Sequence, residues 1–193
     1  MRRIAIIQGH PDPAPSHLLH AMADAYAEGA RAGGHEVRRI DVARLDFPLL
    51  RNQHEFERGP LPAGLVEAQA VIAWAEHLVV LYPLWLGTMP ALFKGFLEQT
   101  LRPDFAFAYR QAGGAEKRLR GRSARVIVTM GMPALAYRFW FGAHSLKSFE
   151  RNVLKFCGIG PVRTCLFGMV EAVGDAKRQK WLDALKGLGK RGT

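Results

Sequence analysis

The sequence has few cysteines, no long apolar run and no metal-ligand spacing. Its two cysteines, Cys157 and Cys165, are too few for a disulfide framework, so we expect buried, reduced thiols. No Cys/His cluster has the spacing of a metal site, and no apolar run is long enough to span a bilayer. The N-terminal apolar run Ile4–Ile7 is shorter than the roughly 7–15 residues of a secretory signal, which favours a cytoplasmic protein.

Acidic residues are the minority charge. The 193 residues include 27 Lys and Arg against 17 Asp and Glu, a formal net charge of +10. Such a balance fits nucleic acid, an acidic membrane surface or an anionic small ligand. Nucleic-acid motifs are absent and the basic residues are dispersed, so we predict solvated basic faces, no nucleic-acid partner and some attraction of phosphate-bearing cofactors. The basic segments are Arg38–Arg39, Lys117–Arg125, Lys147–Lys155 and Lys177–Arg191.

Short apolar segments alternate with amphipathic ones along the chain, which predicts a single α/β domain over residues 1–193. The expected strands are Ile4–Gln8, Glu36–Asp41, Leu78–Leu81, Ala124–Met130 and Val162–Phe167. The expected helices are His17–Ala32, Leu65–Glu76, Pro90–Leu101, Ser145–Phe156 and Asp175–Leu188. This alternation predicts a five-stranded parallel sheet with helices on both faces, and right-handed crossovers favour the flavodoxin-like order 2-1-3-4-5.

Helix caps and connections follow from residue type. Ser16, Thr88 and Asp175 are the expected N-caps, and Gln99 is expected on the water-facing side of the third helix. The expected connections are an irregular segment Ala43–Arg58, a basic excursion Arg102–Arg122 with a turn at Gly113–Gly114, an aromatic loop or lid Gly131–Ala143, and a fraying tail Gly189–Thr193.

Three loops are expected to meet at the carboxyl edge of this sheet, where open α/β sheets bind ligands. The first, GHPDPAPSHL from Gly9 to Leu18, is neither a GxGxxG fingerprint nor a P-loop, yet it leads into a helix N-terminus that suits an anion. Its expected donors are the backbone of Ser16, His17 and Leu18, the Ser16 hydroxyl and the His10 ring. The alternative is a proline-rich turn with a serine cap.

The second and third loops are apolar. The second, Pro83–Thr88, carries Trp85, and its alternative role is core packing. The third, Thr129–Tyr137, contains a glycine that permits close approach of the backbone to a ligand, and a tyrosine hydroxyl. His144 follows, although a lone histidine is more often structural or exposed. Together the loops would suit a flat ring with a phosphate at the helix start.

Four motifs resemble one known family. These are HP followed by a serine after the first strand, YPLWLGTMPALFKGFLEQ after the third, TMG with a later tyrosine after the fourth, and KFCG before the fifth. They are similar to the flavodoxin-like NAD(P)H:quinone oxidoreductases, which include ancillary subunits of glutathione-gated potassium efflux systems. The resemblance runs from Ile4 to Leu185.

The resemblance implies a non-covalently bound flavin, FMN on account of the short chain, with FAD as the alternative. It also implies NADPH or NADH as electron donor, ping-pong hydride transfer to a quinone-like acceptor, and a homodimer. The alternatives are a flavoprotein regulatory subunit of a membrane transporter such as a potassium efflux antiporter, or a flavodoxin-like electron carrier.

The resemblance also implies site residues. His10, Ser16, His17 and Leu18 would hold the phosphate; Pro83, Leu84, Trp85 and Leu86 would line the isoalloxazine; Thr129, Met130, Gly131 and Met132 would meet its other edge; and Tyr137 and His144 would support charge beside it. His17 and Leu18 replace an aromatic and a small polar residue of the family, and Met130 and Met132 replace a threonine and a glycine. Backbone contacts are expected at these four positions.

Overall fold

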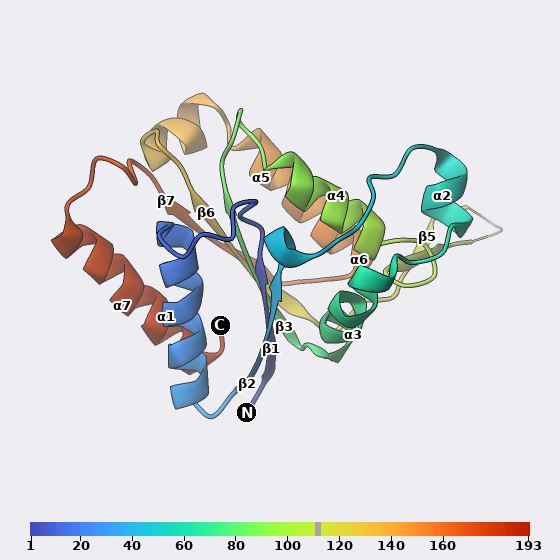
Figure 1. The fold of residues 1–193 in the computed structure, drawn as a ribbon, viewed down its shortest axis with the longest axis horizontal. Coiled ribbons are helices and arrows are strands. Elements are labelled where there is room, and N and C mark those ends of the chain that lie inside the picture. The colour runs from blue at the N-terminus through green and yellow to red at the C-terminus, as the bar shows by residue number, and fades with distance from the viewer. Residues whose placement is uncertain (111–112) are drawn as a thin grey trace.

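The computed structural model describes residues 1–110 and 113–193, and its centre is a parallel sheet of five strands (Figure 1). The strands are β1 (Arg3–Gln8), β2 (Glu36–Asp41), β3 (His77–Pro83), β6 (Ser123–Thr129) and β7 (Val162–Phe167). They are ordered β2-β1-β3-β6-β7. This is the predicted order 2-1-3-4-5 of the core strands, because the labels β4 and β5 belong to a separate hairpin. The predicted fold is confirmed.

The sheet buries both of its faces. The longer helices are α1 (Leu18–Ala32), α3 (Val66–Trp74), α4 (Ala91–Thr100) and α7 (Asp175–Arg191). A further helical stretch consists of α5 (His144–Ser148), the π-helical η4 (Phe149–Leu154) and α6 (Lys155–Cys157). Figure 1 shows α1 and α7 on one side of the sheet and the other helices on the opposite side. Alternate strand residues therefore enter two separate cores, as expected for a strand with period two.

Helices α1 and α7 pack unusually closely. A Cβ atom on Gly29 would overlap the carbonyl of Lys186, and one on Gly189 would overlap the carbonyl of Tyr26. The absence of side chains at these two glycines lets the two helix backbones come into contact, so that together they cover the face of the sheet beneath them.

Several local predictions were wrong. The N-cap of α1 is His17 rather than Ser16, that of α4 is Pro90 rather than Thr88, and that of α7 is Gly174 rather than Asp175. The buried Gln99 does not face water, because its amide donates to the carbonyl of Pro48 at 2.7 Å.

Other segments are more regular than predicted. Within 43–58, the short helices η1 (Val42–Arg44) and α2 (Gln53–Arg58) form, and η2 (Ala63–Leu65) precedes α3. The expected fraying tail instead continues α7 to Arg191, and the Thr193 carbonyl accepts hydrogen bonds from Tyr26 and Arg125. These contacts could not be read from composition.

The basic excursion between α4 and β6 is a hairpin. Strands β4 (Phe107–Tyr109) and β5 (Ala115–Lys117) pair antiparallel. The expected turn at Gly113–Gly114 is present, with positive φ at both glycines, whereas residues 111–112 lie outside the described part. Within the described ranges, no helix is both long and apolar enough to cross a membrane.

Candidate functional site

The three predicted loops do meet at the carboxyl edge of the sheet. The N–H of Leu84, just after β3, donates to the carbonyl of Thr129 at the end of β6, at 2.8 Å. Between the first two loops, the rings of His10 and Trp85 lie edge to face with centroids 6.1 Å apart. Loops far apart in sequence thus form one continuous surface.

The β1–α1 loop gathers three imidazoles. His10 is 7% exposed and stacks on His17 with centroids 4.1 Å apart, and the His20 ring lies 5.6 Å from His10. All three rings bond to Asp12: His10 Nδ1 to its backbone, His20 Nε2 to its carbonyl at 2.9 Å, and His17 Nε2 to its carboxylate at 2.8 Å. We call His10, His17, His20 and Asp12 the histidine cluster.

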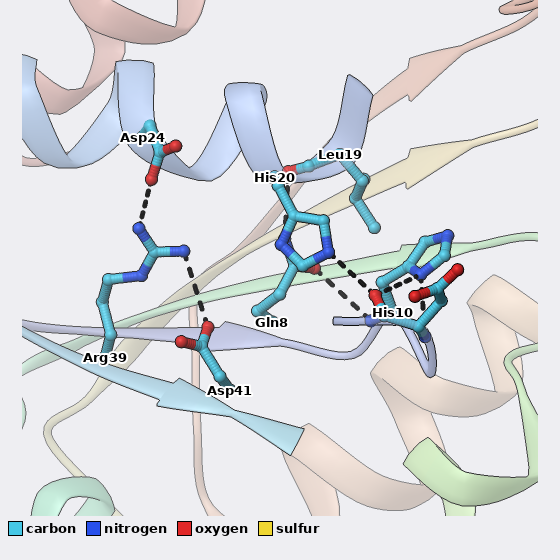
Figure 2. Close-up of polar contacts among 8 residues, drawn as sticks. Gln8, His10, Leu19, His20, Asp24, Arg39 and Asp41 are labelled. Carbon is cyan, nitrogen blue, oxygen red and sulfur yellow. Dashed lines mark hydrogen bonds and ion pairs between the residues drawn. The ribbon is translucent and has the colours of Figure 1, made fainter. Parts of the chain in front are cut away.

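Gln8 supports the histidine cluster from below. It ends β1, is almost completely buried, and its amide nitrogen donates to the carbonyl of Leu19 at 3.0 Å. The same nitrogen lies 3.4 Å from Nδ1 of His20 (Figure 2). The amide oxygen accepts from the N–H of His10. A single buried side chain therefore fixes both the loop and the first turn of α1.

The start of α1 is open to an anion. Its cap residue His17 forms no side-chain hydrogen bond to the helix, no acidic residue lies in the first turn, and Ser16 is exposed. No backbone carbonyl of the described chain accepts from the N–H groups of Leu18 and Leu19. Free N–H groups and the helix dipole favour negative charge at this point.

The β3–α4 loop is a tight apolar turn. Trp85 and Thr88 exchange two backbone hydrogen bonds of 2.8 and 2.9 Å, with Leu86 and Gly87 between them at φ values of 47° and 75°. Positive φ at both central residues defines the turn that best suits a hairpin. A leucine there is strained, and such strain often occurs at functional sites. The turn presents a half-exposed Trp85 and a fully exposed Leu86.

The remaining residues predicted for this loop and the next differ in accessibility. Pro83 is buried in β3, and Leu84 is half-buried. Among the residues after β6, Met130 has its backbone groups engaged, because its N–H donates to Phe167 and its carbonyl accepts from Val170. The carbonyls of Thr129 and Met132 accept from Leu84 and Met169.

Gly131 is the open position of the third loop. Its backbone groups have no backbone partner in the described chain, and a Cβ added there would meet no atom within 4 Å. A flat ligand can therefore approach Gly131 directly. In the neighbouring π-helical η3 (Ala136–Trp140) and just after it, three aromatic side chains of the predicted lid are exposed: Phe139, Trp140 and Phe141.

Tyr137 and His144 lie in different environments. Tyr137 is buried, and its hydroxyl bonds to Ser145 Oγ at 2.8 Å and accepts from the N–H of Leu146 at 3.2 Å. His144 is exposed at the start of α5 and its ring covers Gly142. The tyrosine hydroxyl thus ties the lid to α5.

Sequence reasoning missed part of the histidine cluster. Gln8, Asp12 and His20 were absent from the expected site, although His17 and His20 are three apart at a helix start and so share one face. That spacing next to an aspartate was the available signal. His20 also lines a hollow of about 280 Å³ at the end of β2, together with Asp24, Arg39, Asp41 and Arg44.

Comparisons with known proteins bear on this site. A protein-family profile described as "Flavodoxin-like fold" matches residues 2–189. A Haemophilus influenzae protein named "Uncharacterized NAD(P)H oxidoreductase" is 25% identical over 182 residues, which cover 92% of this chain and 89% of the relative.

Two further similarities extend the comparison. The "FMN-dependent NADH:quinone oxidoreductase" of Ruegeria pomeroyi is 25% identical over 128 residues, 58% of this chain and 63% of the relative. The solved structure of an NAD(P)H:quinone oxidoreductase from Methanothermobacter marburgensis has a TM-score of 0.84 at 24% identity, covering 100% of this chain and 99% of the other. That structure shares the fold.

Proposed function

Because the chain belongs to the family of proteins with a flavodoxin-like fold, we propose that it is an FMN-dependent NAD(P)H oxidoreductase that reduces a quinone or a similar flat acceptor. The main supporting observation is the edge-to-face contact of His10 and Trp85. It brings the start of α1, which suits an anion, next to the exposed apolar side chains of Trp85 and Leu86, which we call the aromatic shelf. The names of the two relatives, an NAD(P)H oxidoreductase and an FMN-dependent quinone oxidoreductase, support the same class of reaction.

The residues present fit a phosphorylated flat cofactor. The phosphate would be held by the free N–H groups of Leu18 and Leu19, with His10, Ser16 and His17 around it. The ring would lie along Trp85 and Leu86, with Gly131 at its far edge, where no atom lies within 4 Å of an added Cβ. When bound, FMN would supply the hydride chemistry, which belongs to the cofactor rather than to the protein.

The protein's own contribution is positioning and exclusion of water. Trp85 and Leu86 are held by a two-residue turn, so their apolar surfaces are fixed before a substrate arrives. Lys94, Trp85 and Leu86 border a second, largely apolar hollow of about 510 Å³ between the β3–α4 loop and α5. A flat acceptor stacked on the shelf would bury its ring there.

The test is the visible absorption spectrum of the purified protein, with mass identification of the cofactor it releases. We expect FMN bands that bleach on addition of NADPH or NADH under nitrogen and return on addition of a quinone. Initial rates should give parallel double-reciprocal lines, because donor and acceptor would use the same place in turn. A protein that takes up neither FMN nor FAD would contradict the proposal.

A matched pair of variants tests the shelf. Trp85→Ala should weaken FMN binding about 10-fold, equivalent to about 1.4 kcal/mol, whereas Trp85→Phe should retain most of the affinity. Flavin fluorescence quenching measures both dissociation constants. Equal affinities for the wild type and Trp85→Ala would place the ring elsewhere.

A further inference from the structure

We propose that a phosphomonoester binds at the start of α1 with uptake of one proton by His10, so that the preference for a phosphorylated ligand over its dephosphorylated form falls as pH rises through neutrality. The identity of the natural ligand as FMN rests on the proposed function. The anion site itself rests on the free N–H groups of the first turn of α1 and on the histidine cluster.

His10 is built to change its protonation state without moving. Its Nδ1 lies 3.1 Å from both the N–H and the carbonyl oxygen of Asp12. The neutral ring can accept from the N–H, and the charged ring can donate to the carbonyl. In both cases Nε2–H is a donor, and the hydrogen bonds that His10 forms with the described residues go through its backbone N–H and its Nδ1. His10 is 7% exposed, and its ring stacks on that of His17, the cap residue of α1.

His17 provides the second imidazole. It stacks on His10 at 4.1 Å, and its Nε2 is 2.8 Å from the exposed carboxylate of Asp12. The hydrogen bond from His17 lowers the pKa of Asp12, so this carboxylate stays ionised. One side of His17 therefore faces the Asp12 carboxylate, and the face of its ring lies against His10.

Gln8 and Asp12 together fix the His20 ring. The His20 Nε2 donates to the Asp12 carbonyl, and its Nδ1 faces the amide nitrogen of Gln8, which is itself a donor. Gln8 cannot simply rotate its amide, because the same group also bonds to Leu19 and His10. His20 is therefore a positioning residue for the Asp12 carbonyl.

The other groups that face the cluster are an uncharged aromatic ring, a paired arginine and Arg44. Trp85, which faces His10 from the next loop, is uncharged. Behind His20, the Arg39 guanidinium contacts the carboxylates of Asp24 and Asp41 (Figure 2), and Arg44 lines the same hollow.

The direction of the pH effect follows from the free state. Burial, followed by the charge of His17, lowers the pKa of His10, so His10 is neutral at pH 7 without a ligand. A phosphate dianion at the helix start favours the charged ring. Proton uptake therefore occurs between the lowered pKa of the free protein and the higher value in the complex, and binding tightens as pH falls through that window.

The experiment compares FMN with riboflavin, which lacks the phosphate, by fluorescence quenching between pH 6.5 and 8.5. Uptake of one proton predicts that the ratio of their affinities rises by up to about 10-fold per unit decrease in pH. The range stays above the second phosphate ionisation near about pH 6. His10→Gln should weaken FMN binding more at pH 6.5 than at pH 8.5 and so remove this slope, whereas His54→Gln, at an exposed histidine on α2, should leave the slope unchanged. A ratio that is independent of pH in the wild type would overturn the proposal.

A second measurement uses the wild type alone, so it remains informative if His10→Gln does not fold. It also separates this inference from the proposed function. The histidine ring signals of the wild type are titrated by NMR with and without inorganic phosphate. Phosphate should raise the titration midpoint of His10 by at least about half a pH unit and leave His54 unchanged. Unchanged His10 signals would overturn the inference even if flavin binds. Raised His10 signals in a protein that binds no flavin would retain it and refute the FMN function.

Discussion

Two buried histidines occupy opposite ends of the same sheet. His10 follows β1 at the carboxyl edge, and His77 begins β3 at the amino edge, where it is 2% exposed. Burial lowers the pKa of both, and for His77 it does so to about 4, with Arg2 as the next cause. His77 Nδ1 lies 2.8 Å from Ser123 Oγ, and its Nε2 has no hydrogen-bond partner within residues 1–110 and 113–193.

The difference lies in what each ring can do with a second proton. Asp12 offers His10 both an acceptor and a donor, whereas a protonated His77 would leave a buried charged N–H unpaired close to two arginines, Arg2 and Arg125. The same residue type with the same direction of pKa shift is therefore a candidate ligand-binding group at one edge and a stability element at the other. Burial alone does not identify a functional histidine.

The largest expected effect lies at the amino edge. Because the folded-state pKa of His77 is about 4 against an ordinary value of 6.5, the unfolded chain binds more protons between these values. Stability is therefore complete above pH 6.5 and is lost as pH falls towards 4, by on the order of 3 kcal/mol. Urea unfolding at pH 7 and pH 4.5 measures the loss.

Substitution of His77 tests whether this residue causes the loss of stability at low pH. His77→Gln should cost stability at pH 7 but flatten the pH dependence, whereas His54→Gln should leave both unchanged, since His54 is exposed. An acid loss that persists unchanged in His77→Gln would break the contrast between the two edges.

The next largest effect on stability is expected at the carboxyl edge, at the glycine that begins the β1–α1 loop. A Cβ on Gly9 would lie 2.7 Å from Phe93 Cγ and 2.9 Å from the Leu81 carbonyl, whereas Gly131 has open space. Gly9→Ala should lower the free energy of unfolding by about 1–3 kcal/mol, and Gly131→Ala by less than about 0.5 kcal/mol. Chemical denaturation compares the two, and equal losses would refute the distinction.

Tyr137 tests whether a predicted catalytic hydroxyl is structural. Tyr137→Phe leaves the buried N–H of Leu146 without its acceptor, so we expect a loss of about 1–2 kcal/mol. Ser145→Ala keeps that acceptor and should cost less than about 1 kcal/mol. Calorimetry and steady-state turnover are measured together. A fall in turnover without any loss of stability would instead assign the hydroxyl to the reaction.

The smallest expected effect is an increase in the free energy of unfolding. Leu86 is fully exposed at φ 47°, so Leu86→Asn, which accepts this conformation more readily, should raise stability by about 0.5–1 kcal/mol. Leu135→Asn is the control, because Leu135 is also exposed but lies at φ −67°. Thermal unfolding distinguishes them. If Leu86→Asn also weakens flavin binding, the strain at Leu86 has a functional counterpart.

The sequence predicted long-range architecture better than local detail. Two strands were predicted to the residue, namely Glu36–Asp41 and Val162–Phe167. The length of a strand and its pattern of side chains can be read from the local sequence. Strand β3 runs on to Pro83, beyond the predicted Leu81, because strand pairing with β6 continues there. The N-caps were wrong because a polar residue near a helix start resembles a cap in the sequence, whereas the observed cap residues, His17, Pro90 and Gly174, form no side-chain capping hydrogen bond.

The candidate site shows the same division. The sequence identified the loops, since they follow strands whose carboxyl ends share one edge. It could not identify the contacts between them, such as the ring contact of His10 with Trp85 or the hydrogen bond from Leu84 to Thr129, or the engagement of the Met130 backbone by Phe167. Those depend on the distances between loops, which no periodicity encodes.

Both chain ends lie away from the three loops. The Arg2 side chain donates to the carbonyl of Gly192, Arg125 near the start of β6 donates to Thr193, and Figure 1 shows N and C towards the same end of the sheet. A protein attached to an electrode or a bead through either end would therefore face its carboxyl edge towards the solution. Immobilisation for biosensing should leave that edge free to receive dissolved reactants.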